Sequence, residues 1–183
     1  MNFAFRILDG VVPYTGLELR SGWVAARTGL AGDAAAAFVG PCEVPNEHLV
    51  DLDDARAGAF IRAASMAHVI AEHRGCRLAQ AVLRQRLLVC ILAEVLGTPR
   101  VRRDGDDLYC EGRKLTVSIA APCPRGSLIH LGINVDPTGA PVPAVGLDEL
   151  KLDAVSVQTE LLARYARELA SIAHAETKVR TVL

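Results

Sequence analysis

The segment from Leu78 to Leu96 has apolar side chains around most of the circumference of a helix. Its apolar positions include Leu78, Val82, Leu88, Val89, Ile91, Leu92, Val95 and Leu96. A helix with so wide an apolar face must bury it against other elements. Gly97 and Pro99 end the pattern, as expected at a helix C-terminus. We therefore predict a helix over residues 77–96 that packs on a β-sheet.

Strands to form that sheet are predicted on both sides of the helix. Short segments of loosely alternating apolar residues, bounded by glycine and proline, are typical of strands. They lie at residues 3–13, 19–28, 34–44, 100–109, 114–121 and 128–135. We expect the strands at 100–109 and 114–121 to pair through a turn at Glu111-Gly112.

Two further helices complete the expected fold. Asp53 or Asp54 can cap a helix over 54–74, and an amphipathic pattern predicts another over 153–175. Strands, then helices, then strands and a last helix are typical of an α+β fold. At 183 residues, we predict one domain over 1–183, a mixed sheet with its helices mainly on one face.

Composition excludes several classes of protein. A formal net charge of −1 gives no basic surface for nucleic acid, and no apolar run reaches the roughly 18–20 residues of a membrane span. The N-terminal sequence is too polar for a signal peptide, so a cytoplasmic location is expected. The five cysteines form no Cys-x-x-Cys pair, which argues against a disulfide framework or a metal site.

The residues best suited to chemistry are two adjacent carboxylates and a nearby lysine. Asp106 and Asp107 precede Lys114, one of only three lysines in the chain. Lys114 is a candidate catalytic residue, although a strand lysine can also simply reach solvent, and the aspartates can simply form a turn. Because adjacent strand residues point to opposite faces, we favour Asp107 as the partner of Lys114 across the hairpin.

The last predicted strand divides into a polar and an apolar face. His130, Gly132 and Asn134 alternate with Ile129, Leu131 and Ile133, so the polar set can line a cleft. The candidate ligand-binding residues are Arg103, Asp106, Asp107, Ser118, His130, Gly132 and Asn134.

Cysteine and histidine residues outside this region offer weaker candidates. Cys42 could be an acyl-accepting nucleophile, and Cys123 another, although buried or loop thiols are the plainer interpretation. His68, Glu72 and His73 do not have the spacing of a zinc-binding helix, so no metal site is predicted there.

Several short motifs resemble those of known families. Gly105-Asp106-Asp107-Leu108, Gly112-Arg113-Lys114-Leu115 and Gly132-Ile133-Asn134-Val135 follow one another as in the core of biotin and lipoate protein ligases. The whole chain is also similar to the family called domain of unknown function 366, notably at 38–42, 50–54, 105–108 and 114–120. Together these resemblances imply a biotin/lipoate ligase-like fold.

The ligase resemblance also implies roles for individual residues. Lys114 matches the lysine that contacts the acyl carboxylate and the adenylate phosphate, and Asp106 and Asp107 match an Asn-Asp pair near nucleotide and metal. ATP and Mg²⁺ are thus cofactors by resemblance, although the residues themselves identify none. The adenylate-covering loops of both ligase families are missing, with residues 27–33 only a loose substitute, so we do not expect a biotin ligase.

The expected function is that of a small-molecule ligase or transferase acting on a carboxylate, acyl or nucleotide-like substrate, centred on Lys114. The alternative is a binding protein that kept the cleft and lost the adenylate loop. The expected partner is a small molecule, with a homodimer left open.

Overall fold

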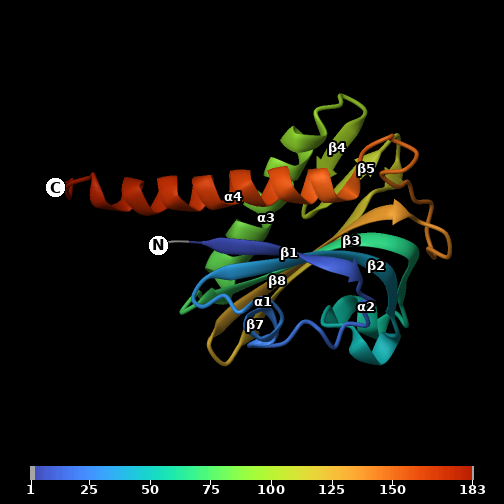
Figure 1. Ribbon diagram of the computed structural model, residues 1–183, viewed down its shortest axis with the longest axis horizontal. Coiled ribbons are helices and arrows are strands. Elements are labelled where there is room, and N and C mark those ends of the chain that lie inside the picture. Colours follow the sequence, from blue (N-terminus) through green and yellow to red (C-terminus); the bar gives the residue numbers. More distant parts are fainter. Residues whose placement is uncertain (1–2, 183) are drawn as a thin grey trace.

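A twisted five-stranded sheet forms the centre of the computed structural model, which describes residues 3–182 (Figure 1). The predicted domain limits at residues 1 and 183 lie outside the described residues. The strands are β1 (Ala4–Val11), β2 (Ala34–Val44), β3 (Ile61–Arg74), β8 (Gly126–Asp136) and β7 (Thr116–Cys123), in that spatial order. β1 and β2 are parallel and the other pairs antiparallel, so the sheet is mixed, as predicted.

Two long helices cover one face of this sheet. α3 (Leu78–Leu96) and α4 (Ala154–Thr177) confirm the helices predicted at 77–96 and 153–175. Asp153 caps α4 by accepting a hydrogen bond from the Ser156 backbone N–H at 2.7 Å. Leu92 of α3, Leu161 of α4 and Leu131 of β8 belong to one fully buried core. The apolar face that defined α3 in the sequence is therefore buried between α4 and the sheet.

The opposite face of the sheet has a smaller core. Trp23 and Val24 of α1 (Trp23–Thr28) pack there with Phe38, Met66 and other buried residues. Figure 1 shows α1 and α2 (Leu52–Arg56) across the sheet from α3 and α4. This face carries only short helices and loops, which leaves room for a pocket.

The predicted helix over 54–74 is wrong. Residues 52–56 form α2, Gly58 follows with a φ of 71°, and Ile61–Arg74 is the central strand β3. β3 is buried on both faces, so its sequence lacks the polar alternation of a half-exposed strand. Its alanines and adjacent apolar residues also fit the spacing of an apolar helix face. Periodicity alone does not distinguish such a helix from a strand that is buried on both faces.

The predicted strand over 19–28 is also wrong. Residues 23–28 form the short helix α1, between Gly22 and Gly29, which have φ values of 83° and 72°. Only glycine adopts this left-handed conformation readily, so the two glycines set the limits of the helix.

Three short strands form a second sheet beside the first. β4 (Val101–Asp104), β5 (Asp107–Cys110) and β6 (Arg113–Lys114) lie in that order, with α3 leading into β4. A turn at residues 105–106 splits the strand predicted at 100–109 into β4 and β5. The turn at Glu111-Gly112 is present but joins β5 to β6, and β7 pairs with β8 instead. The chain thus crosses from the small sheet to the main one just after Lys114.

Candidate functional site

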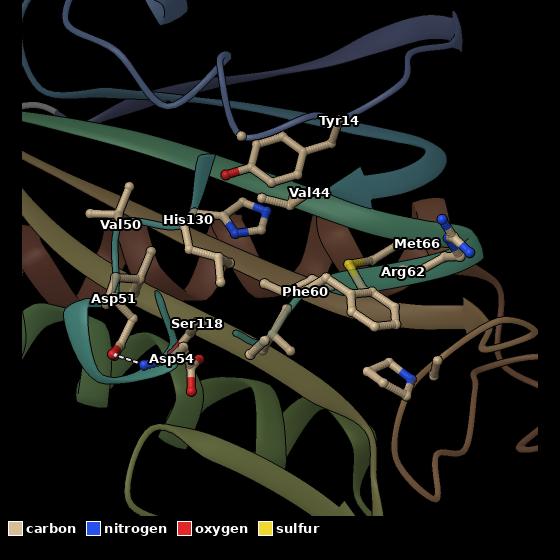
Figure 2. Close-up of a pocket in the computed structure, with 18 of the residues that line it drawn as sticks. Tyr14, Val44, Val50, Asp51, Asp54, Phe60, Arg62, Met66, Ser118 and His130 are labelled. Carbon is tan, nitrogen blue, oxygen red and sulfur yellow. Dashed lines mark hydrogen bonds between the residues drawn. The ribbon is translucent and has the colours of Figure 1, made fainter. Parts of the chain in front are cut away.

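A pocket of about 410 Å³ lies on the sheet face opposite α3 and α4 (Figure 2). Strands β3, β7 and β8 form its floor, and the small sheet closes one end. The segment from Val44 to Arg62 and the loop at 140–144 form its walls. Its volume lies within the range of roughly 300–1,000 Å³ that is usual for small-molecule sites.

Backbone hydrogen bonds fix Lys114 at the end of the pocket nearest the small sheet. Its N–H donates to the Pro143 carbonyl at 2.9 Å, and its carbonyl accepts from the Val145 N–H at 3.0 Å. The Asn134 side chain, from β8, donates a third bond to the Lys114 carbonyl at 3.2 Å. The role of Asn134 is thus to hold the Lys114 backbone, which leaves the ammonium group to the pocket.

Lys114 and Asp107 form the ion pair that their spacing across the hairpin predicts. Lys114 Nζ lies 2.7 Å from Asp107 Oδ2, and the side chains are 28% and 18% exposed. Burial opposes the charge of Lys114, but the hydrogen bond and charge of Asp107 outweigh burial and raise the pKa of the lysine. Burial raises the pKa of Asp107, and Lys114 opposes that rise.

The second oxygen of Asp107 is left without a partner. Asp107 Oδ1 is buried, and no described residue hydrogen-bonds it. Buried polar atoms in folded proteins nearly always have a hydrogen-bond partner. An unpaired carboxylate oxygen beside a pocket therefore indicates a position where a ligand or an ion can bind.

Asp106 lines the pocket together with Asp107. Asp106 lies in the turn between β4 and β5, where side chains do not alternate as in a strand. Gln85 of α3 donates to Asp106 Oδ2 at 2.8 Å and to Ser118 Oγ at 2.7 Å. Arg86 lies 3.3 Å from Asp106 Oδ1. This network anchors the turn to α3 and β7.

Tyr14 and His130 form the other polar part of the pocket. Their rings are stacked, with centroids 4.1 Å apart and planes 11° from parallel. Below them, His68 Nδ1 lies 3.2 Å from His130 Nε2. Burial lowers the pKa of His130 to about 3 and raises that of Tyr14. Both rings are therefore neutral at neutral pH.

Apolar residues fill the space between these two polar parts. Figure 2 shows Val44, Met66 and Phe60 around the cavity, with Arg62 beside the Phe60 ring. The Arg62 Cζ atom lies 5.6 Å from the centroid of that ring. Phe60 is 42% exposed, and it lines the cavity together with these other apolar side chains. The lining thus suits a ligand with an apolar body.

The charged residues of the lining are mostly acidic. They are Asp51, Asp54, Asp106 and Asp107, against Arg62 and Lys114. Four carboxylates against two cations make this an unfavourable place for a strongly anionic group without a counterion.

Three of the predicted site residues do not line the pocket. Arg103 binds the Gly105 carbonyl on the exposed side of the turn. Gly132 is covered by the Met66 side chain. A Cβ added at this glycine would lie 2.3 Å from the Met66 sulfur, so the position has no room for a side chain. Cys42 is buried, with its backbone bridged to that of Tyr14, and burial raises its thiol pKa to about 12, which is the reverse of what a nucleophile needs. The other predicted residues do line it: Asp106, Asp107, Lys114, Ser118, His130 and Asn134.

Sequence reasoning missed the residues contributed by loops. Tyr14, Asp51 and Phe60 line the pocket from segments far from the 102–136 region. The expected helix over 54–74 included Phe60, which the structure places in the loop before β3. The Gly58 break before Phe60 was the available signal that the helix stops.

Histidines 68 and 73, considered together in the sequence, lie on opposite faces of β3. His68 contacts His130 below the pocket, whereas His73 lies on the α4 side, 3.2 Å from Asp33 and 3.1 Å from the Tyr165 hydroxyl. Among residues 3–182, no group of three or more histidine, cysteine, aspartate or glutamate side chains is arranged to hold a metal ion.

Comparison with known proteins places this fold in a family. The family model described as "Domain of unknown function (DUF366)" matches residues 3–180. The chain belongs to this family. A protein of Methanocaldococcus jannaschii described as uncharacterized is 36% identical over 168 residues, covering 87% of this chain and 76% of its own. A structure titled as a protein of unknown function from Pyrococcus horikoshi is 34% identical, with a TM-score of 0.93 over 99% of this chain and 100% of its own.

More distant structures share the fold of this DUF366 protein. The biotin protein ligase of Aquifex aeolicus is 13% identical, with a TM-score of 0.57 over 93% of this chain and 69% of its own. A putative lipoate protein ligase of T. acidophilum with bound lipoic acid is also 13% identical, with a TM-score of 0.55 over 93% and 87%. The predicted biotin/lipoate ligase-like α+β fold is confirmed. Within the described chain, no helix is long and apolar enough to cross a membrane.

Proposed function

We propose that the pocket binds a small carboxylate or acyl compound, and that the protein is a ligase or transferase with Lys114 as its electrostatic centre. The observation that carries this proposal is the half-buried Lys114–Asp107 pair at one end of a small-molecule-sized pocket. Asp107 occupies one of the three N–H donors of the ammonium group. The remaining donors can meet an oxygen of a ligand.

The chemistry of such a lysine suits acyl or phosphoryl transfer. A positioned ammonium group neutralises charge that develops on a carboxyl or phosphoryl oxygen, and it does so best in a partly desolvated site. Three backbone and side-chain hydrogen bonds hold the Lys114 main chain in place. The charge is thus positioned before a ligand arrives, which lowers the cost of reorganisation.

The residues present fit ATP and Mg²⁺, the cofactors implied by resemblance. Mg²⁺ is usually bound through one or two carboxylates together with phosphate oxygens and water. Asp107, with its orphaned buried oxygen, would contribute to the cation site, and Lys114 would meet phosphate. When bound, the nucleotide would activate the carboxylate. Two of the similar structures are titled as ligases with bound ATP, which supports trying it here.

The second candidate is a binding protein without catalytic activity. The acidic residues around Lys114 favour it. Asp107 already neutralises Lys114, and carboxylates outnumber cations in the lining. The segment at 27–33, the loose substitute for an adenylate loop, does not line the pocket. Its Asp33 instead holds His73 and Arg84, at 3.2 Å each.

Turnover assays separate the two candidates. The protein is incubated with ATP, Mg²⁺ and a panel of carboxylic acids, and pyrophosphate release is measured beside Lys114→Ala and Lys178→Ala. Lys178 is exposed after the end of α4, so it is a matched control. Release by the parent and by Lys178→Ala, but not by Lys114→Ala, supports the enzyme. A ligand-dependent rise in melting temperature without release supports the binding protein.

A further inference from the structure

The phenolic hydroxyl of Tyr14 opens into the pocket without a partner in the described chain. Tyr14 is only 4% exposed, and it lines the pocket. None of the hydrogen bonds among residues 3–182 involves its hydroxyl, yet the oxygen is not one of their fully buried unpaired atoms. The hydroxyl is therefore reached from the pocket, where a ligand can meet it.

Contacts on several sides hold Tyr14 in place. Its backbone N–H donates to the Pro41 carbonyl at 2.9 Å, and its carbonyl accepts from the Glu43 N–H at 2.9 Å. The ring is stacked on that of His130, with centroids 4.1 Å apart, and the His68 centroid lies 4.9 Å away (Figure 2). The hydroxyl thus has a fixed position before a ligand binds, which lowers the entropic cost of binding.

The Tyr14 hydroxyl is a hydrogen-bond donor. Burial raises the pKa of the phenol, and the neighbouring Cys42 and Glu18 raise it further, so the proton stays on the oxygen at neutral pH. The O–H turns about its C–O bond toward whatever acceptor the ligand presents. A phenol is also a better donor than acceptor, because the ring withdraws electron density from its oxygen.

Three kinds of ligand group fit poorly beside this hydroxyl. Among residues 3–182 no cation contacts the Tyr14 or His130 ring, so an anionic group would lose water without gaining a counterion. An ammonium group has no lone pair with which to accept the O–H. A hydrocarbon would exclude water and leave the donor unpaired. An uncharged oxygen acceptor has none of these costs.

We propose that Tyr14 is a ligand-binding residue whose hydroxyl donates to an uncharged carbonyl oxygen of the ligand. This inference rests on the proposed function of the pocket, and it adds the group that lies away from Lys114. The ligand then has a carboxylate or acyl group at Lys114, an apolar body, and a neutral carbonyl, such as that of an amide, at Tyr14.

The substitution Tyr14→Phe tests the premise without any ligand. It keeps the stacked ring and removes only the hydroxyl, so no protein group loses a partner and the melting temperature should change little. Tyr165→Phe, which removes a hydroxyl 3.1 Å from His73 Nε2, should lower it. A drop for Tyr14→Phe as large as that for Tyr165→Phe would show that the Tyr14 hydroxyl is bonded within the protein, and would overturn the inference.

Matched ligands test the chemical class. The probes are straight-chain carboxylic acids of increasing length that end in an N,N-dimethyl amide, which has a carbonyl acceptor and no N–H donor. Each is paired with the acid that ends in CH₂–CH(CH₃)₂ instead, and affinities are measured by calorimetry. Tyr14→Phe should weaken binding of the best amide on the order of tenfold, because the carbonyl is left unpaired. The alkyl analogue should bind nearly as it binds the parent.

Amides without a carboxylate separate this inference from the function on which it rests. Simple N,N-dimethylalkanamides lack the group that Lys114 would bind, and NMR titration detects their weaker binding. If they bind the parent better than Tyr14→Phe while no acid depends on Lys114, the Lys114 proposal fails and the role of Tyr14 stands. If Tyr14→Phe binds every amide as the parent does, or if no amide of either kind binds the parent, the role of Tyr14 is overturned. Loss of acid binding in Lys114→Ala would still support the Lys114 proposal.

Discussion

At the scale of single residues, the buried His130 should make stability sensitive to acid. Its pKa is about 3 in the folded protein and 6.5 in the unfolded chain, so between these values the unfolded state binds more protons. Stability present above pH 6.5 is therefore lost as the pH falls toward 3. His130→Phe, which keeps the ring stacking, should lower the slope of unfolding free energy against pH by up to about 1.4 kcal/mol per pH unit.

Urea unfolding over that pH range measures the two slopes. His174→Phe, on the exposed end of α4, is the control and should leave the slope of the parent nearly unchanged. Identical slopes for the parent and His130→Phe would show that the His130 ring is not buried in its neutral form.

At the scale of elements, α3 should tolerate a charge on one side and not on the other. Leu92 is fully buried between α4 and the sheet, whereas Leu83 of the same helix is 70% exposed. Leu92→Asp should unfold the protein, since an unpaired charge in the core costs several kcal/mol. Leu83→Asp should change the melting temperature little. Circular dichroism melts of both variants test this, and a folded Leu92→Asp would contradict the core described above.

A chain of polar contacts ties α4 to the sheet. Arg84 of α3 and His73 of β3 both contact Asp33, and His73 Nε2 lies 3.1 Å from the Tyr165 hydroxyl of α4. Tyr165→Phe should destabilise the protein by about 1–3 kcal/mol, because it leaves a buried ring nitrogen unpaired. Tyr109→Phe, whose hydroxyl bonds no described residue, is the control. Equal urea midpoints for the two variants would show that the contact contributes nothing.

The sequence predicted local features of the site better than the elements around it. The Lys114–Asp107 pair follows from a hairpin spacing, and the two faces of the 128–135 strand follow from alternation, so both were predictable. The central strand β3 was not, because burial on both faces removes the alternation by which strands are recognised. Misassigning 61–74 as helix also hid the contact between His68 and His130, which exists only when two strands are adjacent.

At the scale of the whole molecule, the pocket arises because the two faces of the sheet are covered unequally. α3 and α4 seal one face, while short helices and loops border the other and leave the pocket between them and the small sheet. Its walls come from segments such as 44–62 and 140–144, whose positions depend on tertiary packing. Periodicity could not predict these walls. The shared fold with the ligases likewise identifies the scaffold, and the chemistry depends on the side chains within it.

The most direct test of the central claim is the ligand-induced rise in melting temperature of Lys114 variants. The probe is the carboxylic acid that raises the melting temperature of the parent most. Lys114→Ala should abolish the rise, and it should destabilise the protein by more than the roughly 0–1 kcal/mol of an exposed pair, because Asp107, which is 18% exposed, loses its partner. Lys114→Arg should also fail, because a planar guanidinium does not replace a compact ammonium group, and Lys178→Ala should behave as the parent. An unchanged rise in Lys114→Ala, or the absence of any stabilising acid, would contradict a pocket centred on Lys114.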